Sequence, residues 1–526
     1  MSESNYVLSI DLGTGGPKVA LFADDGSVVA HSFAPVKLQL LAGGGAENDP
    51  DEWWSAISSC AREVTGAGHV PVDRIVAVGC TAQWSGTVAV GADGNHLMNS
   101  VIWMDSRGNG PIRKVAGGGP VKVMGYDVRK VLKWIKLTGG GPSLSGKDPI
   151  AHILFIKEAF PDIYKQTDKF LEPCDYLSFR LTGRMCASYD SITLHWVTDN
   201  RKIDKIDYHP GLLAMSGLDR SKLPDLVPSA SIVGKLSQSA ADDLGVPSGI
   251  PVASATGDIA SAAVGSGAVR DFESHLYIGT SSWITCHVPF KKTSIATNIG
   301  AIPSAIPGKY MVADEHETAG ACLNFLKDSL LLADDELSAG KLNSNPYETF
   351  GLVAGRAEPG SGNVIFTPWL NGERSPVDDH TVRAGFHNLS LSTNRAQIVR
   401  SVFEGVAYNS RWLLGAVDKF IGRRIDTLSF IGGGANSDLW SQIHADVTGR
   451  NIKQMADPVL ANARGAALLA LLAIGKIDVE AIGSMVPVKK TYRPDPAVKP
   501  VYDELYSEFV NIYKANKPIY KRLNKF

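Results

Sequence analysis

The sequence predicts an α/β protein made of two similar domains. Its 526 residues exceed what one hydrophobic core normally holds. Apolar runs typical of buried strands alternate with stretches typical of helices. The strand–turn–strand pattern of residues 10–15 occurs again at residues 276–281, with Gly-Thr in both turns. A repeated hairpin indicates two related domains that hold one ligand between them, and two unrelated turns are the alternative.

The composition is that of a globular protein without a strongly charged partner. Hydrophobic residues make up 44% of the chain and charged residues 20%, with a formal net charge of −2. This balance gives no electrostatic basis for binding nucleic acid or an anionic membrane. The sequence shows no secretory signal region and no apolar run of ~18 residues. The six cysteines lie far apart, which favours a reduced cytoplasmic protein over a disulfide scaffold or a zinc site.

The first hairpin, residues 7–22, carries the clearest signal for a ligand. Its glycine-rich turn, residues 13–16, lets the backbone approach a ligand and point N–H groups at phosphate oxygens. Asp11 stands at the mouth of this turn and is suited to hold a hydrated Mg²⁺ ion, while Lys18 adds a positive charge. An ordinary glycine-rich hairpin is the alternative. The candidate contacts are Gly13, Thr14 and Lys18 for ATP and Asp11 for the metal.

Two familiar phosphate-binding motifs do not fit this hairpin. A P-loop requires Lys followed by Ser or Thr, and Lys18 is followed by Val19. A dinucleotide-binding fingerprint requires a glycine at position 18 and a helix after the turn, whereas a strand follows here. Phosphate binding by a strand–turn–strand unit is typical of actin-like (ribonuclease H-like) ATPase domains. The rest of the sequence must support or exclude a fold of two such α/β domains with a nucleotide cleft between them.

Two later strands of the N-terminal half end in polar residues. A buried strand over 74–80 leads into residues 83–86, and a strand over 100–104 leads to Asp105. Polar groups at strand ends commonly line the ligand cleft of an α/β domain. Residues 83–86 and Asp105 are therefore candidates for contact with a substrate.

The chain is expected to divide into three segments. Within the first, Asp49 predicts the N-cap of a helix that ends near residue 65, and residues 151–168 are also expected to be helical. The glycine-rich stretch 108–150 is expected to form loops around short helices. The predicted segments are an N-terminal domain over 1–248, a C-terminal domain over 249–485 and a helical tail over 486–526.

Asp258 is the candidate catalytic base. It follows a predicted buried strand and a Thr-Gly turn, and a helix of small residues begins directly after it. A carboxylate at a helix N-terminus is stabilised as the anion, so Asp258 could accept a proton from an alcohol that attacks a phosphate. A helix-capping aspartate is the alternative.

Three later segments add to the pattern. Residues 314–317 read Asp-Glu-His-Glu and look like metal ligands, but a zinc motif would need His at position 320, which is Gly. Gly320 instead lies at the start of a predicted helix. Residues 428–437 predict a strand, a glycine turn and a helix start, and residues 462–474 predict a buried alanine-rich helix.

Several segments taken together carry a family resemblance. They are Ile10-Asp11-Leu12-Gly13-Thr14, Thr256-Gly257-Asp258, Ile278-Gly279-Thr280-Ser281, Glu373-Arg374-Ser375-Pro376, Phe403-Glu404-Gly405, Gly432-Gly433-Gly434-Ala435-Asn436 and Ala463-Arg464-Gly465. In this order, from residue 7 to about residue 475, they resemble the FGGY carbohydrate kinases. The match is specific because it rests on the order of many segments and on no single motif.

The resemblance implies two actin-like ATPase domains that transfer phosphate from ATP, with Mg²⁺, to a hydroxyl group of a small-molecule sugar. Asp258 would be the base, and domain closure would exclude water from the reaction. A homodimer is an open alternative to a monomer. The implied contacts are Gly13, Thr14, Gly279 and Thr280 for the ATP phosphates, Gly320, Gly433, Gly434, Ala435 and Asn436 for the adenosine end, and Gln83, Trp84, Ser85, Gly86 and Asp105 for the sugar.

Two departures from the family fall in the sugar-binding half. Members that phosphorylate xylulose usually carry Met-His-Gly where this chain has Trp84-Ser85-Gly86, and their customary lysine falls on His152 here. Ser85 is shorter than His, and Trp84 is bulkier than Met. The resemblance favours D-xylulose as the acceptor. The alternatives are another ketose or polyol, such as ribulose, sedoheptulose, glycerol or erythritol, and an actin-like ATPase without sugar chemistry.

Overall fold

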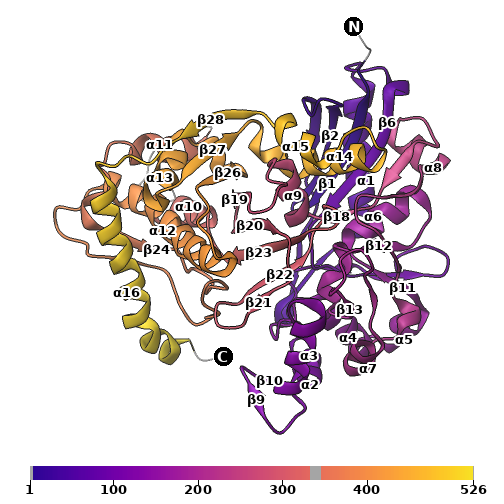
Figure 1. The fold of residues 1–526 in the computed structure, drawn as a ribbon, viewed down its shortest axis with the longest axis horizontal. Coiled ribbons are helices and arrows are strands. Elements are labelled where there is room, and N and C mark those ends of the chain that lie inside the picture. Colours follow the sequence, from indigo (N-terminus) through magenta and orange to yellow (C-terminus); the bar gives the residue numbers. More distant parts are fainter. Residues whose placement is uncertain (1–3, 332–344, 525–526) are drawn as a thin grey trace.

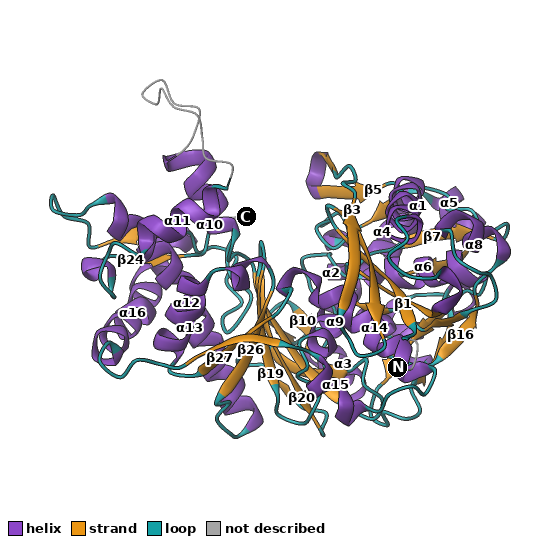
Figure 2. Ribbon diagram, turned by 90° about the horizontal axis from the view of Figure 1, so that it is seen from above, coloured by secondary structure: helices purple, strands orange, loops and turns teal. Residues whose placement is uncertain are grey.

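The structure is a computed structural model that describes residues 4–331 and 345–524. Two mixed sheets, each covered by helices, form two lobes that lie next to each other (Figures 1 and 2). The N-terminal part of the chain builds most of one lobe, and the C-terminal part builds the other. Within these described ranges every helix is too short or too polar to cross a lipid bilayer.

The first sheet is built around the N-terminal hairpin. Its strands are β1 (Tyr6–Gly13), β2 (Gly16–Ala23), β3 (Val28–Phe33), β6 (Ile75–Ala82), β16 (Ile232–Lys235), β17 (Pro251–Ala253) and β18 (Thr256–Gly257). They lie in the order β16-β17-β6-β1-β2-β3, with β18 beside β6. β6 runs parallel to β1, and β17 runs parallel to β6. Nearly every residue of β1 is buried, as in a central strand with helices on both faces.

The second sheet repeats this plan. Its strands are β19 (Ser274–Ile278), β20 (Ser282–Val288), β21 (Thr293–Ser294), β22 (Ile299–Pro303), β23 (Tyr310–His316), β26 (Thr427–Ile431), β27 (Asn451–Met455) and β28 (Val488–Tyr492). They lie in the order β21-β22-β23-β20-β19-β26-β27-β28. The run from β23 to β28 has the same sequence of antiparallel and parallel neighbours as the run from β3 to β16. This repetition confirms the predicted fold of two similar α/β domains.

The helices bury one face against each sheet. In the first lobe, α1 (Pro50–Gly66), α6 (Pro173–Thr182) and α8 (Gln238–Leu244) contribute to the core. Asp49 is the N-cap of α1, as predicted, and its side chain accepts a hydrogen bond from the Asp51 N–H. In the second lobe, α12 (Arg395–Ile421), α13 (Asp438–Thr448) and α16 (Lys499–Leu523) contribute to the core. Tyr502, Phe509 and Tyr513 anchor α16 there.

Two helices of small residues connect the lobes. They are α9 (Asp258–Gly265) and α14 (Ala461–Ala473), and Figure 1 shows α14 beside the N-terminal strands although it belongs to the C-terminal part of the chain. A Cβ on Gly465 would lie 1.9 Å from the Ser261 carbonyl oxygen, so glycine allows the two helix backbones to touch. The Ser9 hydroxyl also donates a 2.6 Å hydrogen bond to the Ala463 carbonyl, which fixes α14 against β1.

Some local predictions differ from the structure. The helix predicted over 151–168 is two helices, α4 (Pro149–Ala159) and α5 (Pro161–Gln166), because proline favours the first position of a new helix. The strand predicted over 100–104 ends early, since β8 covers only Ser100–Val101. Residues 108–150 do form loops around short helices, namely α2 (Asn109–Gly117) and α3 (Val128–Thr138), with a small hairpin of β9 (Lys122–Val123) and β10 (Tyr126–Asp127) between them.

Strands of both sheets extend beyond the limits of the predicted segments. β17 and β18 follow residue 249 but pair with β6, so the first sheet extends past the point where the second domain is predicted to begin. β28 lies in the predicted tail and pairs with β27, so this segment contains a strand of the second sheet before α16.

Candidate active site

The first glycine turn is open, whereas the carboxylate beside it is buried. Asp11 is 1% exposed, and its Oδ2 lies 3.3 Å from Nζ of Lys18, its cross-strand neighbour. Gly16 has a φ of +139°, and a Cβ there would lie 2.0 Å from the Ala34 carbonyl oxygen. Glycine is therefore required to close the turn. Gly15 remains exposed at the tip.

The glycine residues of the second lobe gather around its own hairpin turn. Gly279 and Thr280 connect β19 to β20. The Gly320 N–H donates a 2.8 Å hydrogen bond to the Gly279 carbonyl, and a Cβ on Gly320 would lie 2.4 Å from that oxygen. Gly434 is also close, since a Cβ there would lie 2.6 Å from Cγ2 of Ile278. Gly320, which the resemblance assigns to the adenosine end, is thus in direct contact with the turn assigned to the phosphates.

The turn after β26 presents alternating exposed and buried residues. Gly433 and Asn436 are exposed, whereas Ala435 is buried. The Ala435 carbonyl accepts a 2.7 Å hydrogen bond from Nε2 of Gln454 on β27. This anchor leaves Gly433 and Asn436 as the residues of the turn that a ligand could contact.

Asp258 lies where the two lobes meet. It is the first residue of α9, and its Oδ1 accepts a 2.9 Å hydrogen bond from the Ile259 N–H. Burial, together with the nearby carboxylates of Asp11 and Glu315, raises the pKa of Asp258 to about 7. Asp11 comes from the first hairpin and Glu315 from β23, so the candidate base faces carboxylates of both lobes. Gly257, and not Asp258, is the N-cap of α9.

Gln83 connects the first glycine turn to the predicted sugar-binding segment. Its side chain is 2% exposed, and its Oε1 accepts a 2.9 Å hydrogen bond from the Thr14 hydroxyl. Its Nε2 donates to Oδ1 of Asn48 at 3.2 Å. Both ends of the Gln83 amide are therefore engaged by protein groups. Thr14 in turn accepts a 2.9 Å hydrogen bond from Nε1 of Trp103.

Trp84 and Ser85 contact the surroundings of Asp258. The Trp84 ring lies against the turn before Asp258, because a Cβ on Gly257 would lie 2.7 Å from Cγ of Trp84. The indole N–H of Trp84 donates a 2.9 Å hydrogen bond to the Ser191 carbonyl. Ser85 has a left-handed backbone with a φ of +66°, and its hydroxyl donates to the Lys147 carbonyl at 2.8 Å.

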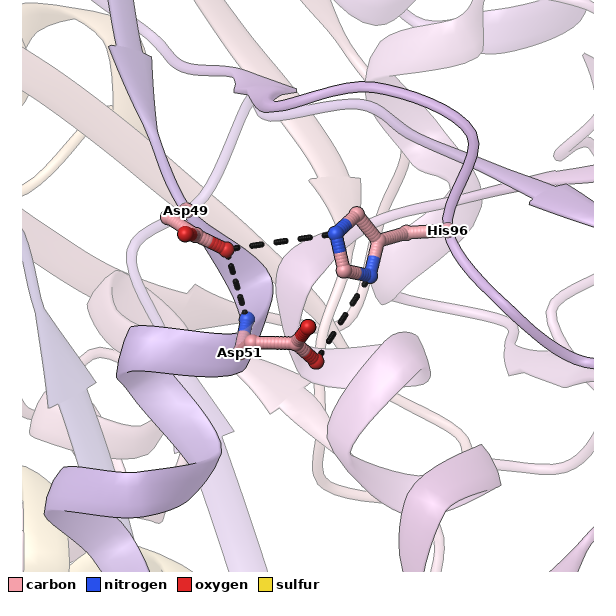
Figure 3. Close-up of side chains that lie close together, drawn as sticks. All are labelled: Asp49, Asp51 and His96. Carbon is pink, nitrogen blue, oxygen red and sulfur yellow. Dashed lines mark hydrogen bonds and ion pairs between the residues drawn. The ribbon is translucent and has the colours of Figure 1, made fainter.

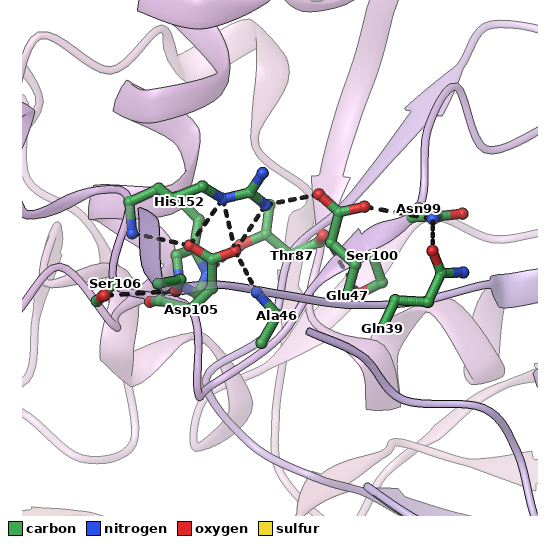
Figure 4. A network of polar contacts seen from close by, with 11 residues as sticks. Gln39, Ala46, Glu47, Thr87, Asn99, Ser100, Asp105, Ser106 and His152 are labelled. Carbon is green, nitrogen blue, oxygen red and sulfur yellow. Dashed lines mark hydrogen bonds and ion pairs between the residues drawn. The ribbon is translucent and has the colours of Figure 1, made fainter. Parts of the chain in front are cut away.

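Asp105 lies at the centre of a buried polar network (Figure 4). Its side chain is 0% exposed, and its Oδ2 accepts a 2.9 Å hydrogen bond from the Ala46 N–H and pairs with Nη2 of Arg107 at 2.6 Å. The Arg107 N–H donates to Oδ1 at 2.8 Å, and Arg107 also pairs with Glu47 at 2.6 Å. His152 lies beside this network, and burial lowers its pKa to about 4. A sugar hydroxyl could contact Asp105 only by replacing one of these hydrogen bonds.

Residues 314–317, which the sequence suggested only as metal ligands, lie at the end of β23 and directly after it. Glu315 and Glu317 both pair with Arg374, with 2.7 Å between Nη1 of Arg374 and Oε2 of Glu315. Asp314 and His316 are buried, at 3% and 1% exposure. This alternation is the two-residue period of a strand, and it places the two glutamates on one face. The pattern Asp-Glu-His-Glu could therefore have indicated a charged strand face at the site.

A separate cluster lies at the start of α1, where Asp49, Asp51 and His96 point toward one another (Figure 3). Nε2 of His96 is 3.9 Å from Oδ1 of Asp49, and its Nδ1 is 3.8 Å from Oδ1 of Asp51. One ring nitrogen of His96 faces each carboxylate, whereas a metal ion would use only one of the two nitrogens. The cluster therefore gives no support to a metal site there.

Comparison with known proteins agrees with the two-lobe arrangement. Residues 6–265 match the sequence model described as "FGGY family of carbohydrate kinases, N-terminal domain", and residues 276–474 match that of the C-terminal domain. The protein named "Xylulose kinase" of Staphylococcus epidermidis is 26% identical over 521 residues, which cover 98% of this chain and 97% of that protein. The "Gluconokinase" of Bacillus subtilis is 24% identical over 530 residues, with 99% and 98% covered.

The fold also agrees with that of a solved structure. The crystal structure of a ligand-bound xylulose kinase from Lactobacillus acidophilus superposes with a TM-score of 0.85 at 23% identity, and the match covers 99% of this chain and 100% of that one. The two sequence matches span most of the chain in the order of its two lobes. This chain therefore belongs to the FGGY family of carbohydrate kinases, which are phosphotransferases with an alcohol group as acceptor.

Proposed function

We propose that this kinase transfers the γ-phosphate of ATP to a hydroxyl group of a small sugar, and that D-xylulose is its acceptor. The observation that carries the mechanism is that Asp258, at the start of α9, lies near the carboxylates of Asp11 in the first hairpin and Glu315 on β23. A base at this point is close to the place where ATP and the sugar would meet between the lobes. The relatives named xylulose kinase support the choice of sugar.

In this mechanism Asp258 accepts the proton of the attacking hydroxyl group. The sugar oxygen forms a bond to the γ-phosphorus, the bond from that phosphorus to the oxygen it shares with the β-phosphate breaks, and ADP leaves. With a pKa of about 7, Asp258 is a stronger base than an ordinary aspartate and is still substantially ionised at neutral pH. Closure of the two lobes around the bound substrates would exclude water, which would favour the sugar over water as nucleophile.

Asp11 fits a role in holding Mg²⁺. It is a buried carboxylate with a single ammonium partner, Lys18, among the described residues, and carboxylate oxygens are suitable ligands for this ion. When bound, Mg²⁺ supplies positive charge that neutralises the phosphate oxygens. The two turns that contain Gly13, Thr14, Gly279 and Thr280 would bring backbone N–H groups to the same phosphates.

One observation favours a second acceptor class. Lys147 is half-buried beside Glu317 and Arg374, and its ammonium group makes no ion pair within 4 Å in the described parts of the chain. Burial lowers its pKa, so an anionic partner would stabilise the charged form. A sugar acid offers such a partner through its carboxylate, and a relative at 24% identity is named "Gluconokinase". Gluconate is therefore the second candidate.

Release of ADP from Mg-ATP, measured across ketoses, polyols and sugar acids, tests the proposal. We expect D-xylulose to give the highest kcat/KM. Turnover with gluconate that disappears in Lys147→Met, while turnover with neutral sugars persists, would establish the second candidate instead. Absence of turnover with every acceptor would refute the proposed sugar kinase activity.

A further inference from the structure

Glu172 is a buried carboxyl group for which the proposed mechanism gives no role. It lies at the N-cap of α6 and is 0% exposed. Its Oε2 accepts a 2.9 Å hydrogen bond from the Gly86 N–H, whereas its Oε1 has no hydrogen-bond partner among the described residues. Its neighbours include the carboxyl groups of Asp148, Asp175 and Asp258. Glu172 thus lies directly behind the segment that contacts the candidate base.

The residues next to Glu172 and Gly86 leave little space around their hydrogen bond. A Cβ on Gly86 would lie 2.5 Å from Cγ of Pro173, the residue after Glu172. Only glycine therefore allows the Gly86 N–H to reach the carboxyl group. The preceding residue, Ser85, has a φ of +66°, a conformation that non-glycine residues keep only when their surroundings enforce it. The bond from Gly86 to Glu172 is one of the contacts that enforce it.

This segment also presents a backbone amide to the base. Burial raises the pKa of Asp258, and the N–H groups of Ile259 and Trp84 act in the opposite direction because they favour the carboxylate. Ile259 is part of α9 and moves with Asp258. Trp84 belongs to the segment that Glu172 holds, so its amide stays in place only while that segment does.

We propose that Glu172 is a positioning residue for phosphoryl transfer, whose buried carboxyl group holds residues 84–86 so that the Trp84 amide stays against Asp258. The inference rests on the proposed role of Asp258 as the base. Burial and the neighbouring carboxylates raise the pKa of Glu172 well above its ordinary value, which favours the neutral form of the carboxyl group. A glutamine, which is neutral and has the same shape, should therefore replace it.

The test follows the titration of Asp258 in the full-length protein by NMR of carboxyl-labelled aspartate, with the resonance assigned by its loss in Asp258→Asn. In Glu172→Leu the Gly86 N–H loses its acceptor, the Trp84 amide is released, and the pKa of Asp258 should rise by roughly half a unit or more. We expect kcat to fall about tenfold, with the KM for ATP unchanged. Glu172→Gln should restore both values.

A matched control removes another glutamate hydrogen bond from the same lobe. Glu63 on α1 accepts a 2.6 Å bond from the Ser32 hydroxyl, and Glu63→Leu should leave the titration of Asp258 unchanged. If Glu172→Leu does not fold, Gly86→Ala replaces it, because the added Cβ displaces the same segment from Glu172.

Three results would overturn the inference. These are an unchanged titration of Asp258 in Glu172→Leu or Gly86→Ala, a loss of kcat that is matched by a loss of ATP affinity and of thermal stability, and a Glu172→Gln variant as defective as Glu172→Leu. The titration needs no acceptor. If no sugar is phosphorylated by the unaltered protein, the proposed function fails, while the titration still decides the role of Glu172.

Discussion

The Ser85 hydroxyl donates a 2.8 Å hydrogen bond to the backbone carbonyl oxygen of Lys147. This bond ties the predicted sugar-binding segment to the loop that precedes α4. The family resemblance implies His at the position of Ser85, and a His side chain there could reach a sugar hydroxyl. Here the shorter side chain is used inside the protein, and it fixes the backbone from which the Lys147 ammonium group projects. Acceptor choice is therefore expected to depend on this pair.

Ser85→Ala should weaken acceptor binding without affecting ATP. Loss of the hydroxyl frees the Lys147 loop, so we expect the KM for the acceptor to rise about three- to tenfold, which corresponds to one ordinary hydrogen bond. Steady-state kinetics with each substrate varied in turn measures the effect. Ser145→Ala is the control, because among the residues that the structure describes the Ser145 hydroxyl bonds only to the hydroxyl of Ser143 in the same loop, at 2.7 Å. Equal changes in the two variants would show that the Ser85–Lys147 bond has no special role.

Asp258→Asn should abolish phosphoryl transfer and retain nucleotide binding. The amide cannot accept the hydroxyl proton, so kcat should fall by about 10²–10⁴. ATP affinity, measured by calorimetry, should remain within about twofold because the proposed base acts on the hydroxyl proton of the acceptor. A variant that keeps more than a tenth of kcat would contradict the assignment of Asp258 as the base.

The pH dependence of the reaction should follow the ionisation of Asp258. Its pKa of about 7 means that the base becomes protonated below neutral pH, so kcat/KM should fall about tenfold per pH unit below this value and level off above it. An ordinary aspartate would place the bend near pH 4. A bend that stays below pH 5 would show that burial and the carboxylates of Asp11 and Glu315 do not control the base.

The same shift predicts an effect on stability. Because the pKa of Asp258 in the folded protein is raised above its unfolded value, its contribution to stability is fully present below about pH 4 and is lost as the pH rises through about 7. Ionised Asp258 therefore destabilises the fold at pH 8. Asp258→Asn should raise the Tm at pH 8 by a few degrees and leave it nearly unchanged at pH 4. Thermal unfolding at the two pH values checks the sign, and a lower Tm at pH 8 would contradict it.

The sequence could predict those parts of the site that are local. Asp11, Gly13 and the Gly279–Thr280 turn lie in hairpins whose apolar strands and glycines are contiguous, so their geometry follows from a short stretch of chain. The position of Asp258 at the start of a helix was also predictable, because a buried strand, a turn and a small-residue helix surround it. The repeat of one hairpin in the other half of the chain was enough to predict two similar domains.

The parts that escaped prediction depend on segments that are distant in sequence. Glu315 lies near Asp258 because β23 pairs with β20 in the second sheet, and Glu172 reaches Gly86 because α6 begins behind the 83–86 segment. Asp105 was predicted to contact a sugar, but Arg107 and the Ala46 N–H already engage both its oxygens. A single sequence does not show which partner a polar side chain will have across the fold.

Gly320→Ala should weaken ATP binding through its contact with the second turn. The added Cβ would lie 2.4 Å from the Gly279 carbonyl oxygen, which is backbone and cannot rotate away. The Gly279–Thr280 turn must therefore move, and with it the N–H groups assigned to the phosphates. We expect the Kd for ATP, measured by calorimetry, to rise at least tenfold.

A second glycine serves as a control that distinguishes the displacement of the Gly279–Thr280 turn from any general effect of adding a methyl group. Gly415 lies on the exposed side of α12, and a Cβ there would meet nothing within 4 Å, so Gly415→Ala should leave ATP binding unchanged. It should also stabilise the protein by about 0.5–1 kcal/mol, because alanine loses less conformational entropy than glycine in a helix. If Gly320→Ala bound ATP as tightly as Gly415→Ala, the Gly279–Thr280 turn could not be a phosphate-binding element, since it cannot keep its position against the new Cβ.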